Sequence, residues 1–109
     1  MDGLTEKRRE DLAVLQKKLG VTFHDVRLLH TALIHTSYAN EAPGRVMHNE
    51  RLEFLGDAVL ELASSTYLYT HFPKLPEGEL TKTRASIVCS ATLAKIAGRL
   101  GLGDYLLLG

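Results

Sequence analysis

Residues 48–62 read HNERLEFLGDAVLEL, and this stretch decides the fold expected of the chain. At about 100° per residue, its four acids lie within about 80° of one another on a helical wheel. These acids are Glu50, Glu53, Asp57 and Glu61. Apolar residues gather on the opposite side, namely Leu52, Leu55, Val59, Leu62 and Ala63. The pattern predicts a long amphipathic helix over residues 49–69, with its apolar side facing the core.

Two helices are predicted before this one. Apolar residues at helical spacing indicate a helix over residues 5–19, and Gly20 supplies the left-handed residue that commonly closes a helix. Either Thr22 or Asp25 caps the second helix. Residues 35–45 (HTSYANEAPGR) are rich in Asn, Pro, Gly and Ser, which predicts a loop.

Two further helices are predicted after the long one. Residues 71–78 contain two prolines and a glycine, which break the chain. Helical patterns follow over residues 79–89 and 90–100, and Gly101 ends the second of them. Because no stretch alternates convincingly between apolar and polar residues, the fold predicted is all-α.

Composition limits the class of protein. The chain has 109 residues, 45% of them hydrophobic, which is enough for one domain with a real core. Thirteen Lys and Arg balance thirteen Asp and Glu, and this excludes a strongly basic nucleic-acid arm and a polybasic membrane anchor. No apolar run is long enough for a membrane helix, and charged residues stand where a signal peptide needs an apolar core. We therefore expect a cytoplasmic protein with no membrane partner.

The chain has a single cysteine, Cys89. One cysteine excludes an intramolecular disulfide framework and a cysteine-rich zinc site. Its apolar surroundings, SIVCS, predict a buried thiol.

The acids of residues 48–62 have two interpretations. The simpler one is a solvated polar face. Yet Asp57 forms like-charge i,i+4 pairs with both Glu53 and Glu61, and such pairs destabilise a helix unless a cation lies nearby. Mg²⁺ accepts one or two carboxylates, and Glu53 and Asp57, one turn apart, have Cβ atoms about 5–6 Å apart. A magnesium site is therefore the sharper hypothesis.

Phe54 places an aromatic ring inside the acidic face. Isolated exposed apolar residues are common, so the ring needs no special explanation. The alternative is that it inserts into a pocket of a partner.

The run HNERLEFLGDAVL, residues 48–60, resembles the signature of ribonuclease III endonuclease domains. The similarity continues through LQKKLGVTF at residues 15–23, ALIHTSYAN at residues 32–40 and LGLGDYLLLG at residues 100–109. The resemblance implies that residues 1–109 are the N-terminal part of an all-helical domain that forms a homodimer. It also implies hydrolysis of double-stranded RNA with Mg²⁺, or Mn²⁺ as a substitute, to 5′-phosphate and 3′-hydroxyl ends. RNA processing such as rRNA maturation is the expected role.

The same resemblance assigns roles to individual residues. Glu53 and Asp57 match metal-binding, catalytic carboxylates, and Glu50 and Glu77 match supporting acids of the same cleft. Phe54 matches a ring that inserts into a socket on the second subunit. Two cations are possible RNA contacts, Lys82 and Arg84. Glu61 receives no role, so it is expected to be solvated.

One part of the family pattern is expected beyond this sequence. In the family, an Asp-x-x-Glu pair follows the position of Gly109 and completes the metal site, and a double-stranded-RNA-binding domain comes after it. We therefore expect a longer enzyme, whose first 109 residues are inactive alone. The alternatives are a non-catalytic RNA-binding or assembly module of the same fold, and a plain helical interaction domain.

Overall fold

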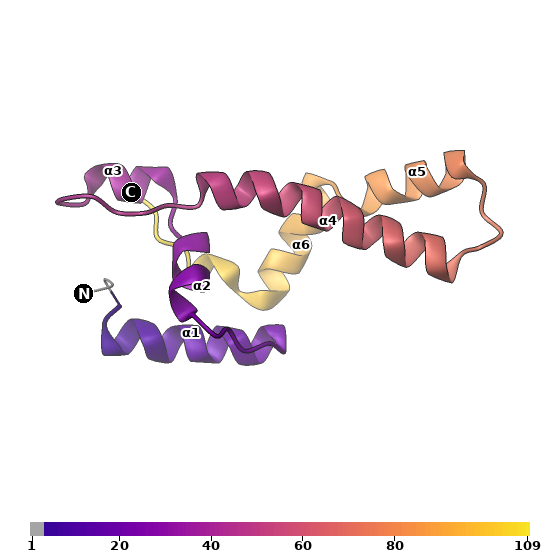
Figure 1. Ribbon diagram of the computed structural model, residues 1–109. Coiled ribbons are helices and arrows are strands. Elements are labelled where there is room, and N and C mark those ends of the chain that lie inside the picture. Colours follow the sequence, from indigo (N-terminus) through magenta and orange to yellow (C-terminus); the bar gives the residue numbers. More distant parts are fainter. Residues whose placement is uncertain (1–3) are drawn as a thin grey trace.

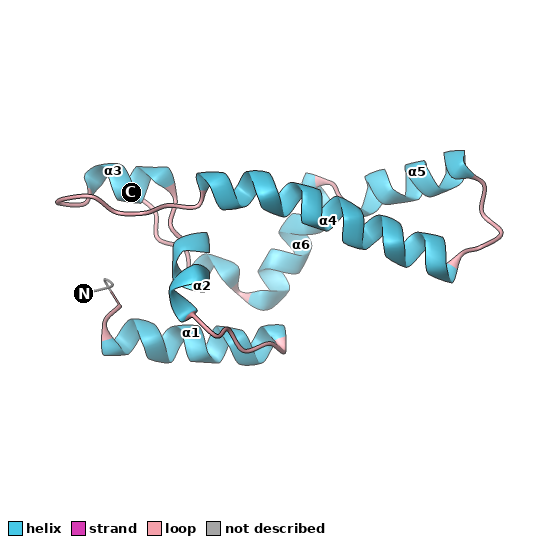
Figure 2. Cartoon of the chain, viewed as in Figure 1, coloured by secondary structure: helices cyan, strands magenta, loops and turns pink. Residues whose placement is uncertain are grey.

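The computed structural model describes residues 4–109, which form helices joined by short loops (Figures 1 and 2). The elements are α1 (Glu6–Leu19), α2 (Val26–Ala32), α3 (Thr36–Glu41), α4 (Glu50–His71), α5 (Glu77–Ile87), α6 (Ser90–Leu100) and the 3-10 helix η1 (Leu102–Asp104). Within the described residues there is no strand, and the only β-type pairing is an isolated bridge between Ile34 and Leu107. The all-α prediction is confirmed.

Several helix ends are set by the local chemistry that the sequence shows. Thr5 caps α1 by accepting a 3.0 Å hydrogen bond at Oγ1 from the Arg8 amide. Gly20 closes α1 with φ 71°, and Gly101 closes α6 with φ 65°, as predicted. Of the two candidate caps of α2, Asp25 performs the role. Its Oδ1 accepts a 3.0 Å hydrogen bond from the backbone amide of Arg27, in the first turn of α2.

The predicted loop at residues 35–45 is partly wrong, because six of its residues form α3. His35 begins this helix: its Nδ1 accepts a 3.1 Å hydrogen bond from the Ser37 amide. A histidine is outside the usual set of capping residues, so residue type did not indicate the start of α3.

Cys89 also differs from its prediction. It lies between α5 and α6, as the N-cap of α6, and it is only half-buried. Its Sγ lies 3.4 Å from the Ser86 carbonyl and 3.3 Å from the Thr92 hydroxyl. The apolar residues around it therefore mark a helix junction rather than a buried helix interior.

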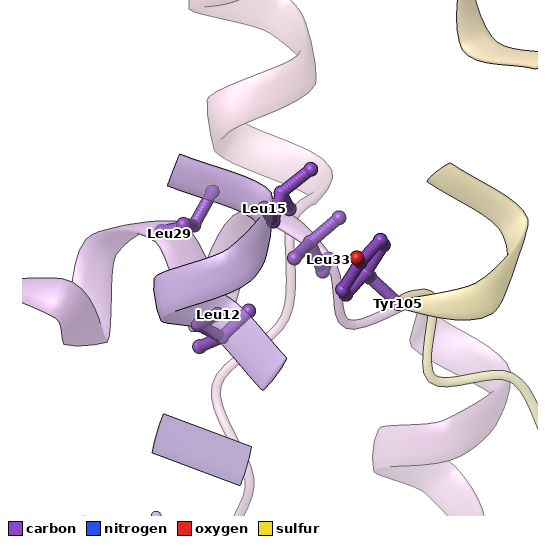
Figure 3. Packing of buried hydrophobic residues seen from close by; sticks show 5 residues of the cluster. All are labelled: Leu12, Leu15, Leu29, Leu33 and Tyr105. Atoms are coloured by element: carbon purple, nitrogen blue, oxygen red, sulfur yellow. The ribbon is translucent and has the colours of Figure 1, made fainter. Parts of the chain in front are cut away.

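The core lies where α1, α2 and the C-terminal tail meet. Figure 3 shows its five buried side chains, which are Leu12, Leu15, Leu29, Leu33 and Tyr105. The tail is held there by its backbone: the Leu107 amide donates to the Leu33 carbonyl at 2.9 Å, and the His35 amide donates to the Leu107 carbonyl at 3.0 Å. Residues far apart in the sequence thus close one small core.

Helices α4 and α5 extend away from this core as a hairpin (Figure 1). The chain measures 53 × 27 × 23 Å and has a radius of gyration of 16.6 Å. A compact domain of this length has a radius of gyration of about 13 Å. Among the described elements, α5 is the one that packs along the distal half of α4. Leu68 is the one buried residue of α4.

The apolar side of α4 was predicted to face the core, and this prediction is wrong for the described chain. Leu55 and Val59 are each 58% exposed and Leu62 is 70% exposed. The reason is the direction of α4: it leaves the core at its first turn, so Leu55, Val59 and Leu62 lie away from the core, and α5 packs along the distal half of the helix without covering them.

Candidate active site

The first turn of α4 is anchored to the core, and this fixes the position of the acids that follow. The Asn49 side chain donates from Nδ2 to the Ala32 carbonyl at 2.9 Å. Its backbone amide donates to the Ile34 carbonyl, also at 2.9 Å. Asn49 therefore ties the start of α4 to the end of α2. Sequence reasoning gave it no such role, because the position before a helix suggests a cap, and Asn49 makes no capping bond with its side chain.

All four acids of the predicted ridge are exposed on α4. Glu50 and Glu53 lie in its first turn, where carboxylates stabilise the partial positive charge of a helix N-terminus. Glu61 pairs with the guanidinium of Arg84, with 3.1 Å between Oε2 and Nε. Asp57 has neither advantage. It is the one acid of the ridge whose presence the helix itself does not explain.

Glu53 and Asp57 stand one helical turn apart with their carboxylates free. Within residues 4–109 neither side chain has an ion-pair or hydrogen-bond partner. Because both are exposed oxygen donors on one face, they suit a hard divalent cation. The described residues contain no group of three or more His, Cys, Asp or Glu placed to hold a metal ion. Glu53 and Asp57 are therefore two candidate ligands rather than a complete metal site within the described residues.

Glu77 lies elsewhere in the fold. It is the first residue of α5 and accepts a 3.0 Å hydrogen bond from the Thr81 hydroxyl. With Tyr69 it borders a pocket of about 420 Å³ between α4 and α5. Tyr69 is about 18 Å along α4 from Asp57, at 1.5 Å per residue. Within this chain Glu77 is thus not brought together with Glu53 and Asp57.

The two predicted RNA contacts on α5 differ in their surroundings. Arg84 is engaged within the fold, since it also donates from Nη1 to the Ser65 hydroxyl at 3.0 Å. Lys82 is exposed. Two residues apart on a helix, the two side chains point about 200° apart, so they do not share one surface. Glu61 is exposed, as expected, and in addition it pairs with Arg84.

Phe54 is 80% exposed, within the same helix face as the acids. A ring this exposed contributes nothing to the core of the described chain. It is available to a partner, as the hypothesis of insertion requires.

Comparison with known proteins identifies the family to which this helix arrangement belongs. The family described as Ribonuclease-III-like matches residues 25–109. The chain is 58% identical over 103 residues to Ribonuclease 3 of Natranaerobius thermophilus, covering 94% of this chain and 44% of that protein. It is 54% identical over 105 residues to Ribonuclease 3 of Geobacillus thermodenitrificans, covering 95% and 43%.

Solved structures agree. The ribonuclease III nuclease domain of Campylobacter jejuni superposes with a TM-score of 0.80 at 44% identity, covering 90% of this chain and 65% of that one. A second structure of that domain, at 2.2 Å resolution, gives the same TM-score at 43% identity, covering 92% and 65%. The first is described as showing structural flexibility in a region involved in dimer formation.

The fold and its exposed, acid-bearing helix are thus those of an all-helical nuclease domain. The chain belongs to the ribonuclease III family. It spans less than half the length of the curated relatives and 65% of the solved nuclease domains. No helix within residues 4–109 is both long and apolar enough to cross a membrane.

Proposed function

We propose that the protein is an endoribonuclease that hydrolyses phosphodiester bonds of double-stranded RNA. The observation that carries this proposal is the exposed, unpartnered pair of Glu53 and Asp57 on the helix that bears the family's signature. An uncompensated pair of carboxylates costs helix stability and repels RNA phosphates. Such a pair is useful on an RNA-cleaving surface only if a cation is bound there.

Mg²⁺, with Mn²⁺ as a substitute, fits this pair. Both ligands are carboxylate oxygens, which magnesium prefers, and both are exposed to solvent and substrate. When bound, the ion supplies charge neutralisation at the scissile phosphate and lowers the pKa of a coordinated water. Glu53 and Asp57 would hold it, while Asn49 fixes the helix that carries both.

Hydrogen bonds within the chain anchor the helix that carries the two proposed catalytic carboxylates. The Asn49 contacts tie the first turn of α4 to the core and so anchor the helix backbone that carries Glu53 and Asp57. Glu50 adds negative charge beside this pair. The resemblance to the ribonuclease III family implies hydrolysis to 5′-phosphate and 3′-hydroxyl ends, and these products are part of the proposal. The wide, shallow minor groove of A-form RNA favours recognition by shape rather than by sequence.

The exposed Phe54 supports a homodimer as the acting form. Two copies related by a two-fold axis would each offer the same ring and the same acids. Each copy would then contribute one carboxylate pair, and the two strands of a duplex would each meet one pair. Supporting roles for Glu50 and Glu77, and RNA contacts by Lys82 and Arg84, belong to the same proposal.

Removal of single carboxylates tests the proposal. In the full-length protein, Asp57→Asn and Glu53→Gln should each lower Mg²⁺-dependent cleavage of double-stranded RNA at least about a hundredfold, because several kcal/mol of charge stabilisation depend on the ion they hold. Binding of the RNA in Ca²⁺, measured by filter retention, should stay nearly unchanged. Glu10→Gln, an exposed acid of α1, is the matched control and should cleave normally.

The outcomes separate the possible functions. Wild-type turnover by either variant would contradict the metal assignment. Wild-type protein that binds the RNA without cutting it would select the non-catalytic RNA-binding module. Running residues 1–109 beside the full-length protein tests whether the shorter chain is inactive alone. A cytoplasmic role in rRNA maturation predicts that cells depleted of the protein accumulate rRNA precursors.

A further inference from the structure

A pocket of about 630 Å³ lies between the start of α1, α2, α3 and the loop before α4. These segments lie in the left-hand part of the molecule in Figure 1. The volume is in the range of pockets that take small ligands, about 300–1,000 Å³. None of the acids proposed for RNA cleavage lines it.

The pocket is locally basic in a chain whose net charge is zero. Among the described residues, its lining contains three arginines, Arg8, Arg27 and Arg45, and no Asp or Glu. Arg27 is paired with Asp25 by two 2.9 Å contacts, and that carboxylate stands outside the lining. Arg45 has no ion pair or hydrogen bond within the described residues. The described lining therefore brings three guanidinium groups together with no carboxylate among them.

Arg8 is held in place with part of its guanidinium unused. Its Nε donates to His30 Nδ1 at 3.1 Å, and its Nη2 donates to the Tyr105 carbonyl at 2.8 Å. Both bonds go to neutral acceptors, and its Nη1 has no partner among residues 4–109. Burial lowers the pKa of Arg8, which shows that its charge has lost hydration. A fixed, partly desolvated guanidinium is a strong site for an anion.

Another part of the lining is apolar. Ile34, Val46, Met47 and Leu107 make up this apolar wall, and the ring of Tyr38 also lines the pocket. A small inorganic anion would leave this wall unused. A ligand with a phosphate at one end and a flat, weakly polar body at the other would use both parts, since bases stack on aromatic and apolar side chains.

We propose that this pocket binds the phosphate of a nucleotide, with Arg8 and Arg45 on the phosphate and the base against the apolar wall. Two sources share this chemistry: a free nucleoside monophosphate, and the 5′-phosphorylated end of an RNA strand. Only the second source rests on the proposed function. Binding is measured without Mg²⁺, so a failure of cleavage and a failure of this pocket are separate results.

Isothermal titration calorimetry in 150 mM salt tests the pocket with adenosine 5′-monophosphate. We expect saturable binding below about 1 mM, at least tenfold weaker binding of adenosine, and at least tenfold weaker binding of the nucleotide by Arg45→Gln. Arg99→Gln, an exposed arginine of α6 outside the pocket, is the matched control and should bind as the wild type. Arg45→Gln breaks no contact of the described fold, so it keeps the test valid if Arg8→Gln fails to fold.

A short RNA with and without a 5′-phosphate distinguishes the sources. Tighter binding of the phosphorylated strand than of the mononucleotide assigns the pocket to an RNA end, and the reverse assigns it to a free nucleotide. The proposal is overturned if neither binds at millimolar concentration, or if Arg45→Gln binds as the wild type does. Inorganic phosphate that binds as tightly as adenosine 5′-monophosphate would overturn the nucleotide assignment.

Discussion

The immediate neighbours of a side chain decide its reactivity, and Cys89 is an example in this chain. The hydroxyl of Thr92, 3.3 Å from Sγ, is the main cause that lowers the pKa of the Cys89 thiol below its ordinary value. The start of α6 adds its backbone amides, and Lys95 adds a positive charge. Because the thiolate is the nucleophile, we expect Cys89 to react faster near neutral pH than an ordinary cysteine.

Thr92→Val should therefore slow alkylation of Cys89 by iodoacetamide at pH 7. A lowered pKa gives more thiolate at a given pH. As the pH increases, the alkylation rate of the wild type should therefore begin to increase at a lower pH than that of the variant. Mass spectrometry of the single cysteine, followed from pH 6 to pH 10, measures both profiles. Thr83→Val is the control, because its hydroxyl donates to the Glu79 carbonyl and not to the thiol. Coincident profiles for wild type and Thr92→Val would refute this cause.

At the scale of elements, the α4–α5 hairpin is joined by a few polar contacts. Arg84 makes two of them, to Glu61 and to Ser65. The guanidinium side chain is 38% exposed and the Glu61 side chain 51%, so solvent weakens their attraction. Each contact is modest, but among residues 4–109 no cluster of buried side chains supports most of the hairpin, and the polar contacts therefore matter for its order.

Arg84→Met should lower the free energy of unfolding of the hairpin by about 1 kcal/mol, because it removes one ion pair and one hydrogen bond. The backbone amides of α5 should exchange hydrogen faster in this variant. Lys82→Met, on the same helix and exposed, should leave both measurements within about 0.5 kcal/mol of the wild type. Equal effects of the two substitutions would show that the Arg84 contacts do not order the hairpin.

Sequence reasoning succeeded for elements whose ends are set locally. Gly20 and Gly101 act through their own backbone within one turn, so their roles can be read from residue type. For α2, residue type narrowed the cap to Thr22 or Asp25, and the structure selects Asp25. Sequence reasoning failed for α3, where a histidine ring replaces the usual cap. It also failed for Arg84 and Glu61, because a pair 23 positions apart depends on how two helices pack.

At the scale of the whole molecule, helical periodicity did not predict what covers each face. The apolar side of α4 and the leucines of α1 follow the same helical spacing in the sequence. Leu12 and Leu15 are fully buried, whereas Leu62 is 70% exposed. The difference comes from the direction in which α4 leaves the core, which is a property of the tertiary arrangement. The carboxylate pair could be predicted, since its geometry lies within one helix.

This contrast between faces can be measured. Leu15→Ala should lower the free energy of unfolding of the 109-residue chain by about 2–5 kcal/mol, because it opens a cavity in the core. Leu62→Ala removes the same atoms from an exposed position and should change it by less than about 0.5 kcal/mol. Urea titration followed by circular dichroism measures both. A loss of several kcal/mol in Leu62→Ala would show that its face is covered in solution.

Self-association is the property of the whole molecule that Phe54 should control. In a two-fold dimer each ring is buried once, and full burial of a phenylalanine side chain is worth about 1.5–3 kcal/mol, so two rings contribute about 3–6 kcal/mol. Phe54→Ala in the full-length protein should therefore raise the dimer dissociation constant at least about a hundredfold in analytical ultracentrifugation. Tyr69→Ala is the matched control, since this ring is 77% exposed on the same helix. If Phe54→Ala remains as dimeric as the wild type, or if Tyr69→Ala weakens the dimer equally, Phe54 is not the ring that joins the two copies.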